Sequence, residues 1–248
     1  MIELPVGPDD RLALLLDYDG TLAPIAPRPQ DAVPLPGVTD ILRRLTLSSR
    51  YRVAVVSGRP VAQLSRWIPA GPVLVGIHGA EWLLPGVGRR CLKLPPQARA
   101  SLEAFSRRLR EMLPPESGFL LEHKMVAVAL HYRLAAARDA AAVLRRAREL
   151  AVELLPPADW AVVEGHKVLE VRPRQADKGA AVRWLCSEWP AFTPVYFGDD
   201  ATDEDAFAAV NEAGGVSVLV AKRPRPTAAR YRLKDPAAVA RCLARLAG

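Results

Sequence analysis

Residues 12–21, Leu12-Ala13-Leu14-Leu15-Leu16-Asp17-Tyr18-Asp19-Gly20-Thr21, combine an apolar run with two acidic side chains. Consecutive apolar residues that end at acids and a glycine predict a buried strand from Arg11 to Tyr18. Two carboxylates directly after a buried strand are unfavourable unless a positive charge neutralises them. A divalent cation meets this need, and Mg²⁺ binds a few carboxylates together with water and phosphate. An Asp-Gly turn with solvated carboxylates is the alternative interpretation, and the Gly20-Thr21 pair favours the cation site.

Strand-like and helical segments alternate on both sides of this stretch. Apolar or β-branched runs predict further strands at Arg52–Val56, Val73–Ile77, Pro194–Phe197 and Val216–Val220. Apolar residues at helical spacing predict helices at Val38–Leu47, Val61–Trp67, Lys178–Trp189, Asp203–Asn211 and Pro236–Leu246. Alternating strands and helices form a parallel sheet that is covered on both faces, so we expect an α/β core.

The middle of the chain has a different pattern. Helices are predicted at Gln97–Leu113 and Ala135–Leu154, and each ends at a Pro-Pro pair. Antiparallel strands are predicted at 119–122, 125–132, 160–164 and 167–171. We therefore expect a discontinuous core made of residues 1–83 and 174–248, interrupted by an α+β cap domain of residues 84–173.

The composition is that of a globular protein, with 248 residues, half of them apolar and a quarter charged. No apolar run reaches the ~18 residues of a membrane span, and the start of the chain does not have the pattern of a signal peptide. We therefore expect no membrane partner and a cytoplasmic location. Three widely spaced cysteines fit neither a disulfide framework nor a zinc site. The net charge of +7 is spread along the chain, which speaks against a nucleic-acid partner and suits a small anionic substrate.

Two more polar clusters follow predicted core strands. Ser57-Gly58-Arg59 follows the second strand and can offer side-chain and backbone donors to a phosphoryl group, although a Ser-Gly pair is most often only a turn. The acidic run 198–205, Gly-Asp-Asp-Ala-Thr-Asp-Glu-Asp, follows the strand that ends at Phe197. A solvated acidic loop is its alternative interpretation. Because ligands bind outside the carboxyl ends of the strands of an open α/β sheet, we expect both clusters to lie near Asp17.

Lys178 opens a predicted helix, where its charge opposes the helix dipole. An exposed lysine is the default interpretation of such a position. The position is favourable if the ammonium faces the carboxylates and a phosphate.

Taken together, the Asp17–Thr21 motif, Ser57-Gly58-Arg59, Lys178 and Gly198-Asp199-Asp200 resemble, in order, the four signature motifs of haloacid dehalogenase superfamily phosphatases. The resemblance spans essentially the whole chain and implies a Rossmann-like core. It also implies that Asp17 is the nucleophile and Asp19 the general acid and base, with Ser57 and Lys178 at the phosphoryl group. The implied Mg²⁺ ligands are Asp17, Asp19 through its backbone carbonyl, and Asp199. Asp203 is expected to belong to the metal site as a supporting residue.

The insert resembles a C2-type cap, which is found in sugar phosphatases. Several segments resemble trehalose-6-phosphate phosphatases more closely than other capped relatives. These segments are 76–81, 121–124, 131–133, 165–173 and 198–204. We expect a small sugar phosphate as the partner and a monomeric protein. The resemblance also implies that Glu122, Lys124 and Glu170 bind the disaccharide when the cap closes, although a set of surface ion pairs is the alternative. Thr21, Gly58, Arg59 and His78 complete the expected substrate-binding set.

Two other functions remain open at this point. A related phosphatase acting on sucrose, mannosylglycerate or glucosylglycerol phosphate shares all four core motifs and differs in its cap contacts. A binding protein of the same fold that has lost catalysis is the second alternative, and the presence of both motif aspartates, the lysine and the acidic cluster speaks against it.

Overall fold

The computed structural model describes residues 5–7 and 9–248, and it divides into two compact units. One unit comprises the chain up to Cys91 together with Asp177–Gly248, and the other comprises Leu92–Ala176. The second unit begins eight residues later than the expected 84. The cause is a hairpin of β4 (Glu81–Leu84) and β5 (Gly88–Cys91), which extends the sheet of the first unit instead of belonging to the insert.

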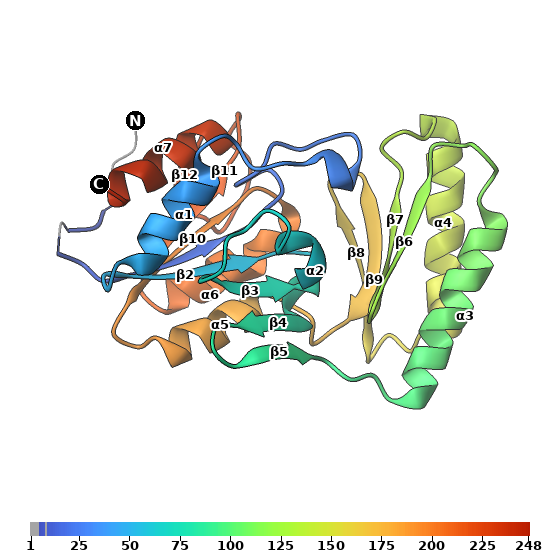
Figure 1. The fold of residues 1–248 in the computed structure, drawn as a ribbon. Coiled ribbons are helices and arrows are strands. Elements are labelled where there is room, and N and C mark those ends of the chain that lie inside the picture. The colour runs from blue at the N-terminus through green and yellow to red at the C-terminus, as the bar shows by residue number, and fades with distance from the viewer. Residues whose placement is uncertain (1–4, 8) are drawn as a thin grey trace. The chain divides into compact units, whose positions relative to one another are not determined.

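The first unit is built on an eight-stranded sheet with the order β12-β11-β10-β1-β2-β3-β4-β5 (Figure 1). Its parallel strands are β1 (Leu12–Leu16), β2 (Tyr51–Val56), β3 (Val73–Gly76), β10 (Thr193–Gly198), β11 (Val216–Val220) and β12 (Tyr231–Leu233). The hairpin β4–β5 is antiparallel. The expected parallel core is therefore present, with an antiparallel edge that the apolar pattern did not predict.

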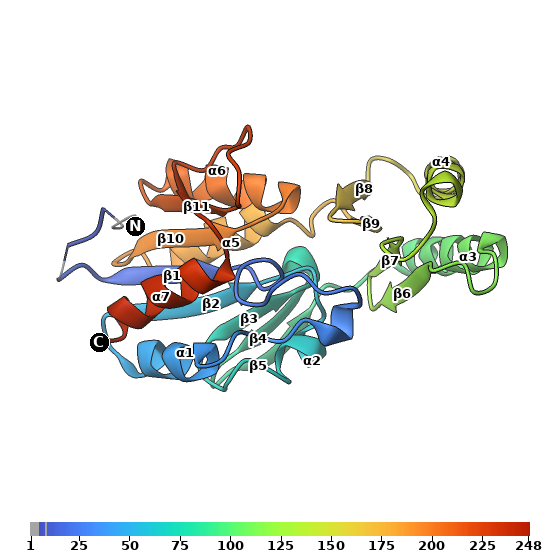
Figure 2. The same cartoon turned by 90° about the horizontal axis from the view of Figure 1, so that it is seen from above.

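Helices cover both faces of this sheet (Figure 2). They are α1 (Val38–Leu47), α2 (Val61–Leu64), α5 (Lys178–Glu188), α6 (Glu204–Glu212) and α7 (Pro236–Leu246). Within β1, Leu12, Leu14 and Leu16 join the core formed with α1 and α7, whereas Ala13 and Leu15 join the core formed with α5 and α6. Every residue of β1 is buried because successive side chains point to opposite, covered faces.

The strand order places the polar clusters together. β1 lies between β10 and β2, and all three run parallel. Asp17 follows β1, Ser57 follows β2 and Asp199 follows β10. Their carboxyl ends therefore meet at one edge. The chain runs outward from β1 to β2 and β3 on one side and from β10 to β11 and β12 on the other, and ligands usually bind where the strand order reverses in this way.

In the described part of the first unit, short 3-10 turns lie at Pro29–Asp31, Ile77–Gly79 and Ala201–Asp203. The predicted third strand was expected to include Ile77, but it stops at Gly76. Ile77 and His78 instead adopt left-handed backbone angles, with φ of 48° and 54°. The chain turns there because two backbone bonds tie it to the preceding loop: Ile77 N–H donates to Arg59 O, and His78 N–H donates to Ser57 O.

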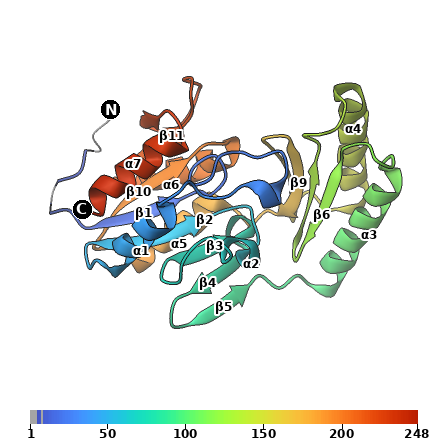
Figure 3. The same ribbon diagram turned by 45° about the horizontal axis from the view of Figure 1, so that its top comes forward.

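The second unit is a four-stranded antiparallel sheet with the order β6-β7-β9-β8 and two helices along one face (Figure 3). Its elements are α3 (Pro96–Met112), β6 (Leu120–Lys124), β7 (Ala127–His131), α4 (Ala137–Leu154), β8 (Trp160–Gly165) and β9 (Val168–Pro173). Val128, Leu130, Leu169 and Val171 pack with apolar residues of α3 and α4. Residues alternate along a strand, so the side chains between these positions lie on the other face.

Among the described residues, no helix is long and apolar enough to span a membrane. The cysteines Cys91, Cys186 and Cys242 are free thiols.

Candidate active site

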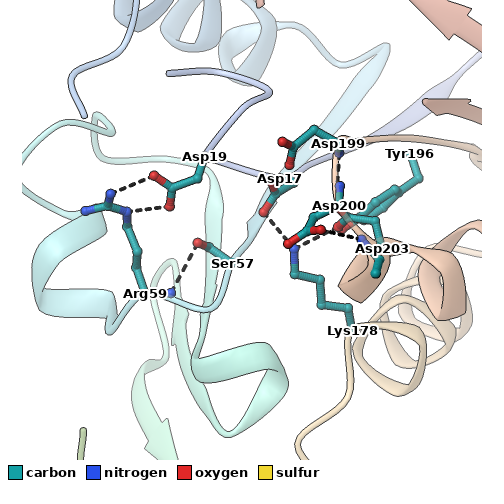
Figure 4. A network of polar contacts seen from close by, with 10 residues as sticks. Asp17, Asp19, Ser57, Arg59, Lys178, Tyr196, Asp199, Asp200 and Asp203 are labelled. Atoms are coloured by element: carbon teal, nitrogen blue, oxygen red, sulfur yellow. Dashed lines mark hydrogen bonds and ion pairs between the residues drawn. The ribbon is translucent and has the colours of Figure 1, made fainter. Parts of the chain in front are cut away.

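Lys178 connects two of the predicted acidic motifs (Figure 4). Its Nζ donates to Asp17 Oδ1 at 2.7 Å and to Asp203 Oδ1 at 2.7 Å, and all three side chains are buried. Lys178 is the first residue of α5, whose N-terminus is capped by the Asp177 side chain. The unfavourable position of the lysine at a helix start is therefore offset by two carboxylates within hydrogen-bond distance.

Asp203 is fully buried, and its carboxylate accepts four hydrogen bonds. Oδ1 accepts from Lys178 Nζ and from the Tyr196 hydroxyl at 2.7 Å, and Oδ2 accepts from the backbone N–H groups of Asp199 and Asp200 at 3.0 Å each. Four donors use the whole acceptor capacity of a carboxylate. Asp203 therefore fixes the backbone that carries Asp199. Tyr196 is a participant that the sequence interpretation missed, and its one signal was a hydroxyl-bearing residue within the apolar strand β10.

Asp199 lies against the loop that carries Asp17 and Asp19. A Cβ atom on Gly20 would come within 2.0 Å of Asp199 Oδ2, and Gly20 has a φ of +74°. Glycine is therefore required here both by space and by backbone conformation. Carboxylate oxygens of Asp17, Asp199 and Asp203 lie within 4.8 Å of one another, close enough to share one cation.

Burial perturbs the ionisation of these groups. It raises the pKa of Asp17 from 3.8 to about 8, although Lys178 opposes the shift. Burial, together with Asp17 and Asp203, also raises the pKa of Asp199 well above its usual value. For Lys178, burial alone lowers the pKa, but Asp17 and Asp203 more than offset it and raise the value overall. Three carboxyl groups thus face one ammonium, and a bound cation favours their ionised forms.

Asp19 is turned away from this cluster and toward Arg59 (Figure 4). Arg59 Nε donates to Asp19 Oδ2 and Nη2 donates to Asp19 Oδ1, both at 2.6 Å. Arg59 was expected to bind substrate, but in this structure its guanidinium forms a two-point ion pair with Asp19. Ser57 is buried beside it, and its Oγ accepts from the Arg59 backbone N–H at 3.2 Å.

The remaining expected residues of the first unit lie around these loops. Thr21 is fully buried, and its hydroxyl has no hydrogen-bond partner among the described residues. His78 packs its ring against Gly58, where a Cβ atom would approach His78 Nε2 to 2.5 Å. Gly58 therefore needs to be glycine for His78 to occupy its position. Glu81, at the end of the segment similar to sugar phosphatases, accepts from the Val61 N–H at 2.8 Å and so supports the start of α2.

Glu122, Lys124 and Glu170 lie on the face of the second sheet opposite α3 and α4. Strand register pairs Glu122 with Ala129 and Ala129 with Glu170, so both acids lie in one row across the sheet. Lys124 Nζ donates to Glu170 Oε2 at 2.9 Å, and Glu122 Oε2 lies 3.1 Å from His131 Nε2. Arg172, two residues after Glu170, shares this face and was not expected in the site. This face thus carries two acids on either side of Ala129, with Lys124 bonded to one of them, and we call Glu122, Lys124 and Glu170 the charged row.

Comparison with known proteins agrees with this arrangement. The family model described as trehalose-phosphatase matches residues 15–237. This chain is 36% identical to the trehalose-phosphate phosphatase of Mycobacterium marinum, over 96% of its length. It is 38% identical to that of Mycolicibacterium paratuberculosis, over 95% of its length. The chain spans only 62% of the length of each of these relatives.

A solved structure gives the same result. The C-terminal domain of C. albicans trehalose-6-phosphate phosphatase superposes with a TM-score of 0.85 at 27% identity, covering 96% of this chain and 93% of that one. This likeness confirms the expected haloacid dehalogenase-like fold. The chain therefore belongs to the trehalose-phosphatase family.

Proposed function

We propose that this chain hydrolyses trehalose 6-phosphate to trehalose and phosphate, with Asp17 as the nucleophile and Mg²⁺ as cofactor. The observation that carries the proposal is the position of Asp17. Asp17 follows the central strand β1, and its Oδ1 lies 2.7 Å from the buried Nζ of Lys178. Carboxylate oxygens of Asp199 and Asp203 lie within 4.8 Å of an Asp17 oxygen. A carboxylate in this setting is suited to attack phosphorus in line while the surrounding positive groups balance the charge of the phosphate.

The donor set fits Mg²⁺. The oxygens of Asp17 and Asp199 converge, and Gly20 leaves the space in which the Asp199 carboxylate lies. Asp203 already accepts four hydrogen bonds, so we propose that Asp17, Asp199 and the Asp19 carbonyl hold the ion and that Asp203 orients Asp199. When bound, Mg²⁺ supplies positive charge that neutralises the carboxylates and the phosphoryl oxygens.

The protein groups then divide the reaction into two steps. In the first, Asp17 bonds to phosphorus and the bond to the sugar oxygen breaks, while Asp19 gives a proton to that oxygen. In the second, Asp19 takes a proton from water, whose oxygen bonds to phosphorus as the bond to Asp17 breaks. Lys178 holds Asp17 in place, and Ser57 donates to the transferring phosphoryl group.

The charged row of the second unit supports the choice of sugar. A disaccharide presents many hydroxyl groups, and Glu122, Lys124 and Glu170 together offer both acceptors and a donor on one sheet face. We propose that these three side chains recognise the trehalose moiety. Relatives of the same family that are named for trehalose phosphate support this assignment.

The test is phosphate release from p-nitrophenyl phosphate and from a panel of trehalose, sucrose, mannosylglycerate and glucosylglycerol phosphates, each with Mg²⁺ and with EDTA. We expect release from trehalose 6-phosphate that depends on Mg²⁺. Preference for another sugar phosphate overturns the sugar assignment but leaves Asp17 in its role. Absence of release from every compound, including p-nitrophenyl phosphate, supports a non-catalytic binding protein.

A further inference from the structure

The pair of Arg59 and Asp19 has a geometry that a simple surface salt bridge does not have. Two parallel contacts of 2.6 Å join the Arg59 guanidinium to both oxygens of Asp19. The Arg59 side chain is only 10% exposed, against 37% for Asp19. A two-point contact of this kind fixes the plane of the carboxylate as well as its position.

Arg59 is itself held from a second side. Its guanidinium lies over the Tyr18 ring, 5.0 Å from the ring centroid. Tyr18 is fully buried, and its hydroxyl donates to Ala32 O at 2.9 Å. The backbone N–H of Arg59 is bonded to Ser57 Oγ in the loop after β2. The arginine is therefore fixed by the core on one side and presents its flat donor edge to Asp19 on the other.

From this arrangement we propose that Arg59 is a positioning residue, which orients the Asp19 carboxylate for proton transfer rather than binding the phosphoryl group. The inference rests on the proposed function, in which Asp19 gives a proton to the leaving oxygen and later takes one from water. An ionised carboxylate has about four acceptor sites, and the guanidinium occupies one on each oxygen. The remaining site on each oxygen is then held in a fixed direction and stays open for a proton.

The consequence is specific to the shape of arginine. Lysine keeps the positive charge at this position but presents a single point donor, which cannot hold a carboxylate plane. An Arg59→Lys variant is therefore expected to keep phosphate binding and lose proton transfer. We expect kcat to fall at least about 10-fold with KM changed less than about 3-fold, since general acid–base catalysis contributes roughly 10²–10⁴-fold. The inhibition constant of inorganic phosphate is expected to stay within about 2-fold of the wild type.

A double-mutant cycle with Asp19→Asn tests the inference directly. If Arg59 acts through Asp19, the second substitution adds little to the first, and the double variant is expected within about 3-fold of Asp19→Asn alone. Multiplied losses, or a phosphate inhibition constant that rises in parallel with KM, overturn the proposal in favour of substrate binding by Arg59. Arg66→Lys, an exposed arginine just after α2, is the matched control and is expected to behave as the wild type.

A second readout uses p-nitrophenyl phosphate, whose leaving group needs little protonation. In Arg59→Lys we expect a rapid burst of p-nitrophenol followed by slow turnover, because only the hydrolysis of the phosphorylated Asp17 then needs an oriented base. Loss of the burst together with turnover overturns the proposal. If Arg59→Lys does not fold, Arg59→Ala with added guanidinium replaces it, and recovery of kcat by guanidinium but not by methylammonium is the supporting result. Absence of rescue is the opposing result.

The two proposals fail in distinguishable ways. A wild-type protein that releases no phosphate from any substrate overturns the proposed function and, with it, the role of Arg59. If the wild type is active but the losses of kcat in the two single variants multiply in the double variant, only the role of Arg59 is overturned.

Discussion

The ammonium of Lys178 lies 2.7 Å from Asp17 Oδ1, although 161 residues separate them in the chain. The same ammonium lies 2.7 Å from Asp203 Oδ1. One buried cation thus joins the loop after β1, the start of α5 and the loop after β10. Both the stability of the core and the state of the nucleophile depend on this contact.

Replacement of Lys178 by methionine is expected to lower the free energy of unfolding by about 3 kcal/mol or more, measured by urea denaturation in EDTA. The reason is that Asp17 and Asp203 remain buried without their counterion. Lys222→Met removes an exposed lysine from the same unit and is expected to change stability by less than about 0.5 kcal/mol. Equal stability of both variants contradicts the structural role of Lys178.

Replacement of Asp17 by asparagine is expected to abolish phosphate release while the protein remains folded. Asparagine has nearly the same shape and keeps a hydrogen-bond acceptor for Lys178, but it does not attack phosphorus. Activity is measured with trehalose 6-phosphate and p-nitrophenyl phosphate, and folding by circular dichroism. Turnover retained on either substrate places the nucleophile elsewhere.

The raised pKa of Asp17 predicts that the stability difference between the wild type and Asp17→Asn depends on pH when no metal is bound. The folded-state pKa is about 8 and the unfolded value is 3.8, so between them the folded protein binds more protons than the unfolded chain. Wild-type stability attributable to this group therefore falls as pH rises through that window, and Asp17→Asn lacks the effect. Thermal melts in EDTA are expected to show that the Tm of the variant minus that of the wild type grows from about pH 5 to pH 8. A Tm difference that stays constant from pH 5 to pH 8 contradicts the raised pKa of Asp17.

Replacement of Gly20 by alanine tests the proposed Mg²⁺ site. The added Cβ meets Asp199 Oδ2 at 2.0 Å, so Asp199 has to move. We expect the Mg²⁺ concentration needed for half-maximal activity to rise at least about 10-fold, since tenfold corresponds to only about 1.4 kcal/mol of binding. Gly37→Ala is the matched control, because Gly37 also has a positive φ, +83°, but nothing lies within 4 Å of the added atom. A normal Mg²⁺ requirement in Gly20→Ala argues against Asp199 as a ligand.

Replacement of Lys124 by alanine separates sugar recognition from chemistry. The variant is expected to raise KM for trehalose 6-phosphate about 10-fold or more, because a hydrogen bond to a charged group contributes about 1.5–3 kcal/mol. The effect on p-nitrophenyl phosphate is expected to be much smaller, since that substrate has no sugar. Arg110→Ala, an exposed position on α3 of the same unit, is the control. Equal losses on both substrates contradict sugar recognition by Lys124.

Local pattern was sufficient for much of the fold. The bounds of α1, α7 and β11 agree with those predicted, because apolar spacing and the Gly, Pro and Asp residues at their ends are properties of neighbouring residues. The hairpin strand β5 was missed because it consists of glycine, two exposed arginines and a cysteine. Charged edge strands of this kind lack the alternation that marks a half-buried strand.

The sequence by itself determined the alternation of strands and helices, the insert and the identity of the polar residues after each strand. Only the tertiary structure decided their partners: Arg59 pairs with Asp19, and Asp203 accepts four hydrogen bonds instead of standing as an open ligand. The physical reason is that backbone periodicity arises between residues a few positions apart. Hydrogen-bond partners depend instead on which strands become neighbours in the sheet, and that is settled by packing of the whole core.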